Sequence, residues 1–212
     1  MIAPEGWVFV WIPLGLGIAA LVADWPWVGW PLIALGVFAL FFFRNPDRHC
    51  EHPPNIACSP ADGRVIVVGE SPENLADLGL PQQISVFMSI FNVHVNRAPI
   101  DAELFDYTYN PGRKISAFKE KASLENEQNL SVWEGLHGRL ALKQIAGLVA
   151  RRIVFDHEVG ATVNRSARIG LIRYGSRLDV FLPESAEVLV RIGDRVRAGE
   201  SPLAILKSTP QP

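Results

Sequence analysis

The chain opens with two long apolar runs and continues as a region of short, alternating ones. Residues 6–23 and 25–43 contain no charged residue, and Asp24 separates them. Because a bilayer core needs about 20 helical residues, each run is marginally long enough to span a membrane. The break at residues 24–27 (DWPW) is typical of a turn at a membrane interface, where tryptophan is enriched. The pattern predicts a membrane-associating helical hairpin over residues 1–44, and a helical pair buried within the fold is the alternative.

The flanks of the apolar runs indicate an orientation. No basic residue precedes the first run, and the second run follows at once, which argues against a cleaved signal peptide. Arg44 and Arg48 follow the second run, and basic residues favour the cytoplasmic side. We therefore expect a cell-membrane protein whose remaining chain lies on the cytoplasmic side. Whether the hairpin spans the bilayer or lies in it stays open.

The rest of the chain predicts a mainly β domain. Residues 45–60 carry four prolines and are expected to form a connector, followed by one domain over residues 61–212. Residues 113–130 are polar and lack Gly and Pro, so a mobile loop and a short helix both stay open. Apolar or β-branched runs punctuated by glycine and proline predict antiparallel or mixed strands. These runs are Arg64–Val68, Ile84–Phe91, Leu140–Ile145, Arg152–Phe155, Leu178–Leu182 and Val188–Ile192.

Two segments repeat one spacing. Val159–Val163 and Ile192–Val196 share an apolar-Gly-x-x-Val pattern, and each lies between two strand-like runs. Such units predict two similar hairpins packed face to face. Together with Ser59–Val65 (SPADGRV), they resemble the flattened β-sandwich of biotinyl and lipoyl carrier domains. A carrier needs a lysine at the hairpin tip, and the corresponding turn has Gly175-Ser176-Arg177 instead. We predict the sandwich fold without the carrier function.

Composition excludes some partners. The net charge is −2 and there is no basic tract, so nothing favours nucleic acid binding. His49, Cys50, His52 and Cys58 could ligate zinc, but they are crowded and a Pro-Pro pair interrupts them. A polar linker without metal is therefore expected. Two cysteines give no disulfide framework and are compatible with a reducing compartment.

A candidate nucleophile lies in residues 173–181 (RYGSRLDVF). Glycine is uncommon inside strands, and a turn is the ordinary explanation for a Gly-Ser pair. The residues around Ser176 do not form the Gly-x-Ser-x-Gly elbow of α/β-hydrolases. His94 and Asp62 are nevertheless available as a base and its orienting carboxylate. The parts of an activated serine are present without a hydrolase scaffold.

Five stretches together resemble the short form of phosphatidylserine decarboxylase, a pyruvoyl-dependent lyase. They cover nearly all of the chain beyond the hairpin, in order. The resemblance implies a zymogen of phospholipid biosynthesis that acts on a membrane lipid. The stretches are Ser59–Val65 (SPADGRV), Phe87–Pro99 (FMSIFNVHVNRAP), Lys121–Asn129 (KASLENEQN), Gln144–Val154 (QIAGLVARRIV) and Ile169–Pro183 (IGLIRYGSRLDVFLP).

The resemblance also implies how the prosthetic group arises. The Ser176 hydroxyl attacks the Gly175 carbonyl, which no side chain shields, and the acyl group shifts from nitrogen to oxygen. Loss of the Ser176 Cα proton then expels the Gly175 carboxylate, and the resulting dehydroalanine hydrolyses to a pyruvoyl group and ammonia. His94 is the implied base, oriented by Asp62. A large fragment, 1–175, and a small fragment, 176–212, would remain together as a heterodimer, with further oligomerisation left open.

The implied reaction converts phosphatidylserine to phosphatidylethanolamine. The lipid amine forms a Schiff base with the pyruvoyl group at Ser176, which takes up the electrons released with carbon dioxide. Long-form enzymes have a second histidine where this chain has Phe91, so His94, or a water that it holds, is the expected proton donor. The serine lipid accepted and the head-group-binding residues stay open, and none of Arg44, Arg48, Arg151 and Arg152 is assigned to binding. The alternative function is a membrane-tethered β-sandwich adaptor with no covalent chemistry.

Overall fold

The chain forms two compact units, residues 1–47 and 48–212. The computed structural model describes residues 1–112, 126–147, 152–173 and 176–207, and for Ser176 the backbone alone. Gly175, the predicted cleavage residue, and Arg151 lie outside the described residues. The finer division into a hairpin, a connector and a decarboxylase domain stays a prediction.

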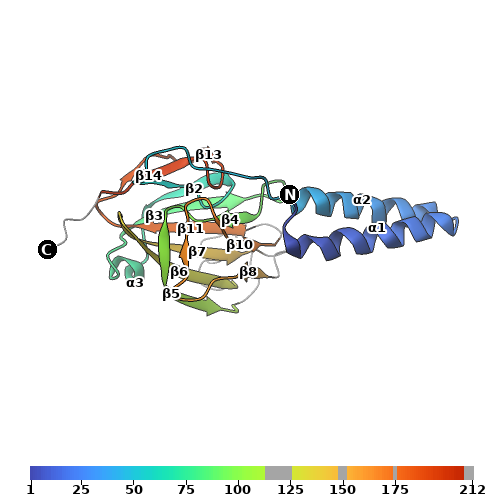
Figure 1. Cartoon of the computed structure of the whole chain (residues 1–212), viewed down its shortest axis with the longest axis horizontal. Helices are drawn as coiled ribbons and strands as arrows, with labels where there is room; N and C mark the ends of the chain where they lie inside the picture. The colour runs from blue at the N-terminus through green and yellow to red at the C-terminus, as the bar shows by residue number, and fades with distance from the viewer. Residues whose placement is uncertain (113–125, 148–151, 174–175, 208–212) are drawn as a thin grey trace. The chain divides into compact units, whose positions relative to one another are not determined.

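The first unit is the predicted helical hairpin. A 3-10 turn, η1 (Pro4–Gly6), leads into α1 (Trp7–Val22), and α2 (Pro26–Phe42) runs back beside it (Figure 1). The helices approach closely at glycines, because a Cβ at Gly29 would come within 2.5 Å of Leu21 and one at Gly36 within 2.6 Å of Leu14. Backbone pairing between Ala3 and Phe43, at 2.8 Å, closes the open end of the hairpin. The predicted helical pair is confirmed.

The outer faces of the hairpin are apolar. Pro4–Val22 is long and apolar enough to cross a bilayer by length and composition, whereas Pro26–Phe42 is shorter. Trp11, Trp27 and Trp30 are 63%, 92% and 63% exposed. Exposure of large apolar side chains is costly in water and favourable in lipid. By length and composition, α1 could therefore serve as a membrane anchor, and the side of the membrane on which the chain lies stays a prediction.

The second unit is built mainly from antiparallel sheets, as the sequence predicted, and its described residues also contain one short helix (Figure 1). The largest sheet has eight strands in the order β13-β2-β3-β11-β7-β6-β5-β9, and two three-stranded sheets have the orders β4-β10-β8 and β1-β14-β12. The elements are β1 (Ile56–Cys58), β2 (Gly63–Glu70), α3 (Glu73–Ala76), β3 (Gln82–Met88), β4 (Val95–Arg97), β5 (Ala102–Asn110), β6 (Gln128–Gly135), β7 (Gly138–Ala146), β8 (Ile153–Phe155), β9 (Thr162–Val163), β10 (Arg168–Ile172), β11 (Ser176–Leu182), β12 (Glu187–Val188), β13 (Arg195–Val196) and β14 (Pro202–Ile205).

The strand at the centre of the large sheet, β11, is buried on both faces. Leu178, Val180 and Leu182 face the main hydrophobic core, since side chains alternate along a strand. The intervening Arg177 and Asp179 are only 4% and 1% exposed, on the opposite face. A strand with this burial is held firmly along its length.

The repeated segments do form two similar units. In each, the outer strands pair with one another, β8 with β10 and β12 with β14, while the short middle strand joins the large sheet. The turns between the outer and middle strands use Gly160 (φ +89°) and Gly193 (φ +101°), a conformation that favours glycine. The repeated glycines therefore serve the same turn in both units.

Two of the long strands, β5 and β6, were not predicted. β5 alternates, but many of its side chains are exposed and polar, so its sequence resembles a loop. β6 begins at Gln128, inside the segment expected to be a loop or a short helix, and that expectation is wrong for Gln128–Leu130. Residues 113–125 lie outside the described residues. β6 forms because it pairs with β5 on one side and β7 on the other.

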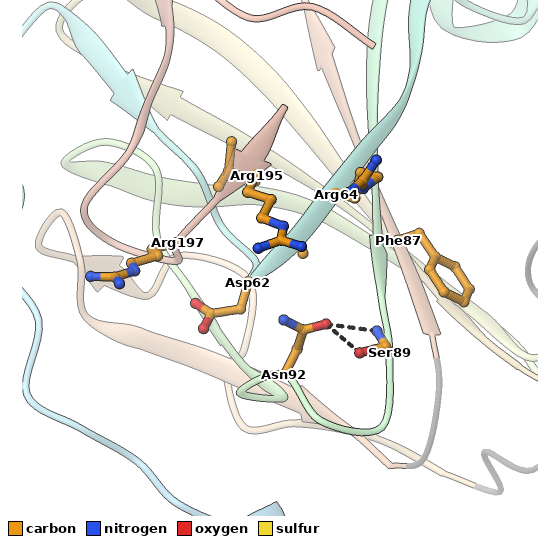
Figure 2. A pocket seen from close by; sticks show the side chains of 9 residues that line it. Asp62, Arg64, Phe87, Ser89, Asn92, Arg195 and Arg197 are labelled. Atoms are coloured by element: carbon orange, nitrogen blue, oxygen red, sulfur yellow. Dashed lines mark hydrogen bonds between the residues drawn. The ribbon is translucent and has the colours of Figure 1, made fainter. Parts of the chain in front are cut away.

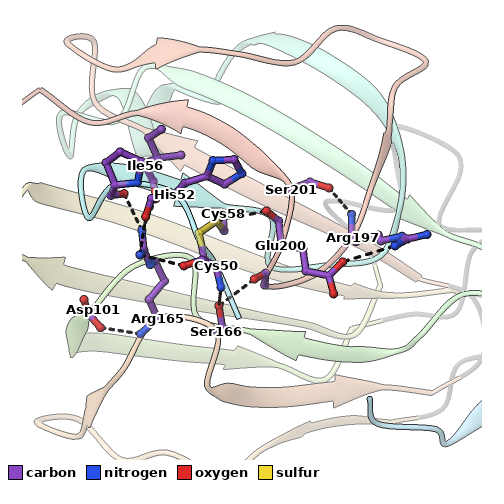
Figure 3. Close-up of a disulfide and its surroundings, with 12 residues drawn as sticks. Cys50, His52, Ile56, Cys58, Asp101, Arg165, Ser166, Arg197, Glu200 and Ser201 are labelled. Carbon is purple, nitrogen blue, oxygen red and sulfur yellow. Dashed lines mark hydrogen bonds and ion pairs between the residues drawn. A yellow bond between two sulfur atoms is a disulfide. The ribbon is translucent and has the colours of Figure 1, made fainter. Parts of the chain in front are cut away.

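The predicted connector carries a disulfide. Cys50 and Cys58 are joined, with their Cα atoms 6.5 Å apart (Figure 3). Arg165 donates hydrogen bonds to the carbonyls of Cys50 and His52, at 3.2 and 2.8 Å, which holds the intervening strap in place. The cysteine count did not predict this pairing, because two cysteines alone define no framework, and the count therefore gives no support for a reducing compartment.

Candidate functional site

Ser176 begins the central strand of the large sheet. Its backbone lies opposite Met88 of β3 on one side and Ala146 of β7 on the other. The structure therefore brings the predicted nucleophile position next to the end of β3, which leads into the loop that carries His94.

His94 is fully buried and its ring is held by a backbone group. Its Nδ1 lies 3.0 Å from the Asn92 carbonyl oxygen. Since a carbonyl can only accept, Nδ1 must donate, and a neutral ring then has its lone pair on Nε2. The Ile172 amide donates to the His94 carbonyl at 3.3 Å, which ties the histidine to β10, four residues before Ser176. A base role for His94 would therefore use Nε2, and that role stays a prediction.

Asp62 is 7% exposed and its carboxylate is fully engaged. Arg48 donates to both carboxylate oxygens, at 3.1 and 3.2 Å, and the Ala198 amide donates at 2.7 Å. Among the residues that the structure describes, the contacts of this carboxylate do not include His94. The orienting role expected for Asp62 stays a prediction.

Phe91 occupies the loop between β3 and His94 and is 65% exposed. An apolar ring carries no exchangeable proton, so it cannot replace the second histidine of the long-form enzymes. The residue that donates a proton after decarboxylation stays open in the structure.

A cavity of about 420 Å³ opens beside these residues (Figure 2). Phe87 and Ser89, which flank Met88 on β3 and the loop beyond it, form one wall. The other walls come from the start of β2 and from β13. Because Phe87 and Ser89 adjoin Met88, which is paired with Ser176, the cavity lies beside that strand position. Its charged and polar lining residues are Asp62, Arg64, Ser89, Asn92, Arg195 and Arg197.

Sequence reasoning missed a buried ion pair one residue beyond Ser176. Arg177 Nε lies 2.5 Å from Asp179 Oδ1, and Arg177 Nη2 contacts Asp179 Oδ2 and the Ser85 hydroxyl at 3.0 Å each. Burial raises the pKa of the Asp179 carboxyl, and the Arg177 guanidinium opposes that shift. Burial also lowers the pKa of nearby Lys143. The Arg-x-Asp spacing, two residues apart on a strand, was the signal that could have identified the pair.

The chain matches a protein family over most of its length. The family described as phosphatidylserine decarboxylase matches residues 35–204. The chain is 40% identical to the phosphatidylserine decarboxylase proenzyme of Magnetococcus marinus, over 98% of this chain and 96% of that protein. It is 42% identical to the proenzyme of that name from Geotalea uraniireducens, over 97% and 96%, and 45% identical to the one from Ruegeria pomeroyi, over 96% and 94%. These matches confirm the resemblance and the enzyme class read from the sequence. The chain belongs to the phosphatidylserine decarboxylase family.

Proposed function

We propose that this chain is a proenzyme that cuts itself between Gly175 and Ser176 and then converts phosphatidylserine to phosphatidylethanolamine. The observation that carries the proposal is the near full-length match to proteins named phosphatidylserine decarboxylase proenzyme. The name of those relatives states both the substrate and an inactive precursor.

Self-cleavage requires a serine hydroxyl that reaches the preceding carbonyl and a base that takes its proton. In our proposal Ser176 attacks Gly175, and His94 accepts the proton on Nε2. The hydrogen bond from Nδ1 to the Asn92 carbonyl supports this role, because it leaves Nε2 unprotonated in the neutral ring. Asp62 would orient His94, as the resemblance implies, while Arg48 and the Ala198 amide hold its carboxylate.

The pyruvoyl prosthetic group fits the position of residue 176. The first residue of β11 pairs with β3 on one side and with β7 on the other. A group formed there would therefore be fixed in place at the end of the strand. When present, such a group supplies an electron-withdrawing carbonyl that accepts the electrons released with carbon dioxide. His94, which is buried, would hold the proton that returns to the product carbon.

The two fragments should stay associated after the cut. The small fragment, residues 176–212, contains β11, which pairs along its length with β3 and along most of it with β7, both from the large fragment. It also contains β13 and β14, which pair with β2 and β1. This interleaving supports a heterodimer whose fragments part only on unfolding.

The helical hairpin would anchor the enzyme to the membrane that holds its substrate. The exposed tryptophans and the length of Pro4–Val22 support an anchor. Arg44 and Arg48, which follow the second apolar run, support a cytoplasmic location for residues 48–212.

The test combines a denaturing gel, intact mass and an activity assay on the purified full-length protein. We expect two fragments, with the mass of the smaller one showing a pyruvoyl start, and release of carbon dioxide from phosphatidylserine. Ser176→Ala should remain one chain of 23.4 kDa and be inactive. A single uncut band in the unsubstituted protein, with no decarboxylation, would instead favour the adaptor function.

A further inference from the structure

We infer that the cavity beside Ser176 is a phosphodiester site in which Arg64, Arg195 and Asn92 hold the head-group phosphate of the serine lipid. The inference rests on the proposed function and assigns residues that recognise the substrate. It depends on three features of the cavity: an unusual pair of arginines, a neutralised carboxylate and an amide aimed into the same space.

Arg64 and Arg195 lie directly opposite each other on paired strands. They are register partners where β13 meets β2, and both side chains are exposed at the cavity. Like charges directly opposite on neighbouring strands are destabilising. Neither guanidinium has a carboxylate partner among the residues that the structure describes. A bound anion would relieve this repulsion, and a phosphate matches the fork of guanidinium donors.

The single carboxylate that lines the cavity in the described part of the chain does not cancel these charges. Asp62 is bound by Arg48 through both oxygens and by the Ala198 amide. Arg197, the third arginine of the lining, lies 3.7 Å from Glu200 and is partly neutralised. The cavity therefore keeps a net positive charge that comes mainly from Arg64 and Arg195.

Asn92 adds a neutral donor. Its Oδ1 accepts hydrogen bonds from the Ser89 amide and hydroxyl, at 2.9 and 2.7 Å, which fixes the orientation of the side-chain amide. The Nδ2 group then lies on the side of Asp62 and Arg195 (Figure 2). Two guanidinium groups and one amide in one cavity are a donor set for an oxyanion, whereas a purely electrostatic surface would need no oriented amide.

The distance to residue 176 suits a serine head group. Arg64 lies opposite Phe87, and Phe87 lies opposite Arg177, so Arg64 is two strands from the residue after Ser176. Two strand spacings are roughly 10 Å, a distance that a long arginine side chain and the serine head group can span together. The amine and the phosphorus of that head group are four bonds, or about 5 Å, apart. Arg64 shares the sheet face of Phe87 and Arg177, opposite to that of Met88, so a ligand with its phosphate at Arg64 would bring its amine to residue 176 around the end of β3, where Ser89 lines the cavity.

The experiment measures decarboxylation by the full-length, self-cleaved protein. The substrates are glycerophosphoserine, which has the phosphodiester but no acyl chains, and phosphatidylserine in vesicles of phosphatidylcholine. Arg64→Gln and Arg195→Gln are compared with Arg191→Gln, an exposed arginine of the β12–β13 segment outside the cavity. Loss of one charged hydrogen bond should raise KM for glycerophosphoserine by about 10- to 100-fold in the cavity variants and leave Arg191→Gln unchanged. Inorganic phosphate should inhibit the unsubstituted protein competitively and the cavity variants less.

Each outcome separates this inference from the proposed function. Self-cleavage does not use the lipid phosphate, so the cavity variants should still produce both fragments. If the unsubstituted protein neither cuts itself nor decarboxylates, the proposed function fails. If it does both and the cavity variants keep their KM for glycerophosphoserine, the phosphodiester site is refuted. If the cavity variants turn over more slowly on vesicles alone, the arginines attract the protein to the lipid surface. If phosphate inhibits but the variants keep their KM, the cavity is a free-phosphate site. Either result overturns the inference.

Discussion

Removal of Arg177 should convert the buried ion pair beside Ser176 into a pH-dependent defect. Arg177 and Asp179 have side chains that are 5% and 1% exposed and share two hydrogen bonds. Arg177→Met leaves the Asp179 carboxylate buried without its cation. Breaking a buried pair in this way costs about 3–5 kcal/mol. We expect a loss of that size in the free energy of unfolding at pH 8.

The loss should shrink in acid. Burial already raises the pKa of Asp179 above its ordinary 3.8, and without Arg177 nothing comparable opposes that rise. A carboxyl with a raised pKa in the folded state holds its proton more tightly than in the unfolded chain, so stability falls as pH rises through the interval between the two values. The stability of Arg177→Met should therefore be closest to that of the parent protein near pH 4 and fall away toward neutral pH. Arg177→Met combined with Asp179→Asn should recover most of the loss at pH 8.

The measurement is urea unfolding in detergent, followed by tryptophan fluorescence. All variants carry Ser176→Ala, so that one chain unfolds, and they lack residues 1–43, so that Trp133 is the remaining tryptophan. The control is Glu134→Gln, which breaks the exposed Arg139–Glu134 pair and should cost less than about 1 kcal/mol at every pH. A loss for Arg177→Met that is as small as the control's, or that does not change with pH, would refute this account of the pair.

Four further results are expected. His94→Ala and Asp62→Asn should each slow self-cleavage by about 10²- to 10⁴-fold on a timed denaturing gel, and a variant that cleaves at the normal rate would remove that residue from the mechanism. Deletion of residues 1–43 should preserve self-cleavage and turnover of short-chain phosphatidylserine but reduce turnover on bilayers; failure to fold would instead make the helices part of the core. After cleavage the fragments should co-elute in native gel filtration and separate in denaturant, because β11 lies between β3 and β7. Reduction of Cys50–Cys58 should lower the free energy of unfolding by roughly 2–4 kcal/mol, and an unchanged value would show that the disulfide does not form in solution.

Local features of the chain were enough to predict the helical hairpin and much of the sheet. Uncharged runs of 18 and 19 residues leave few alternatives to apolar helices, and α1 and α2 lie within those runs. Strands with one apolar face, such as Leu178–Leu182, were visible because their alternation follows from the strand itself. The stretches around Asp62, His94 and Ser176 likewise identified the family before any fold was known.

Contacts between distant residues could not be predicted in this way. β5 and β6 have polar, exposed positions and exist because they pair with neighbours. The opposition of Arg64 and Arg195 joins residues that are far apart in the chain, and no pattern near either one encodes it. The same holds for Asp62, whose partners Arg48 and Ala198 come from opposite ends of the domain. Periodicity reports how one segment meets its surroundings, whereas strand register is settled only when all the segments pack together.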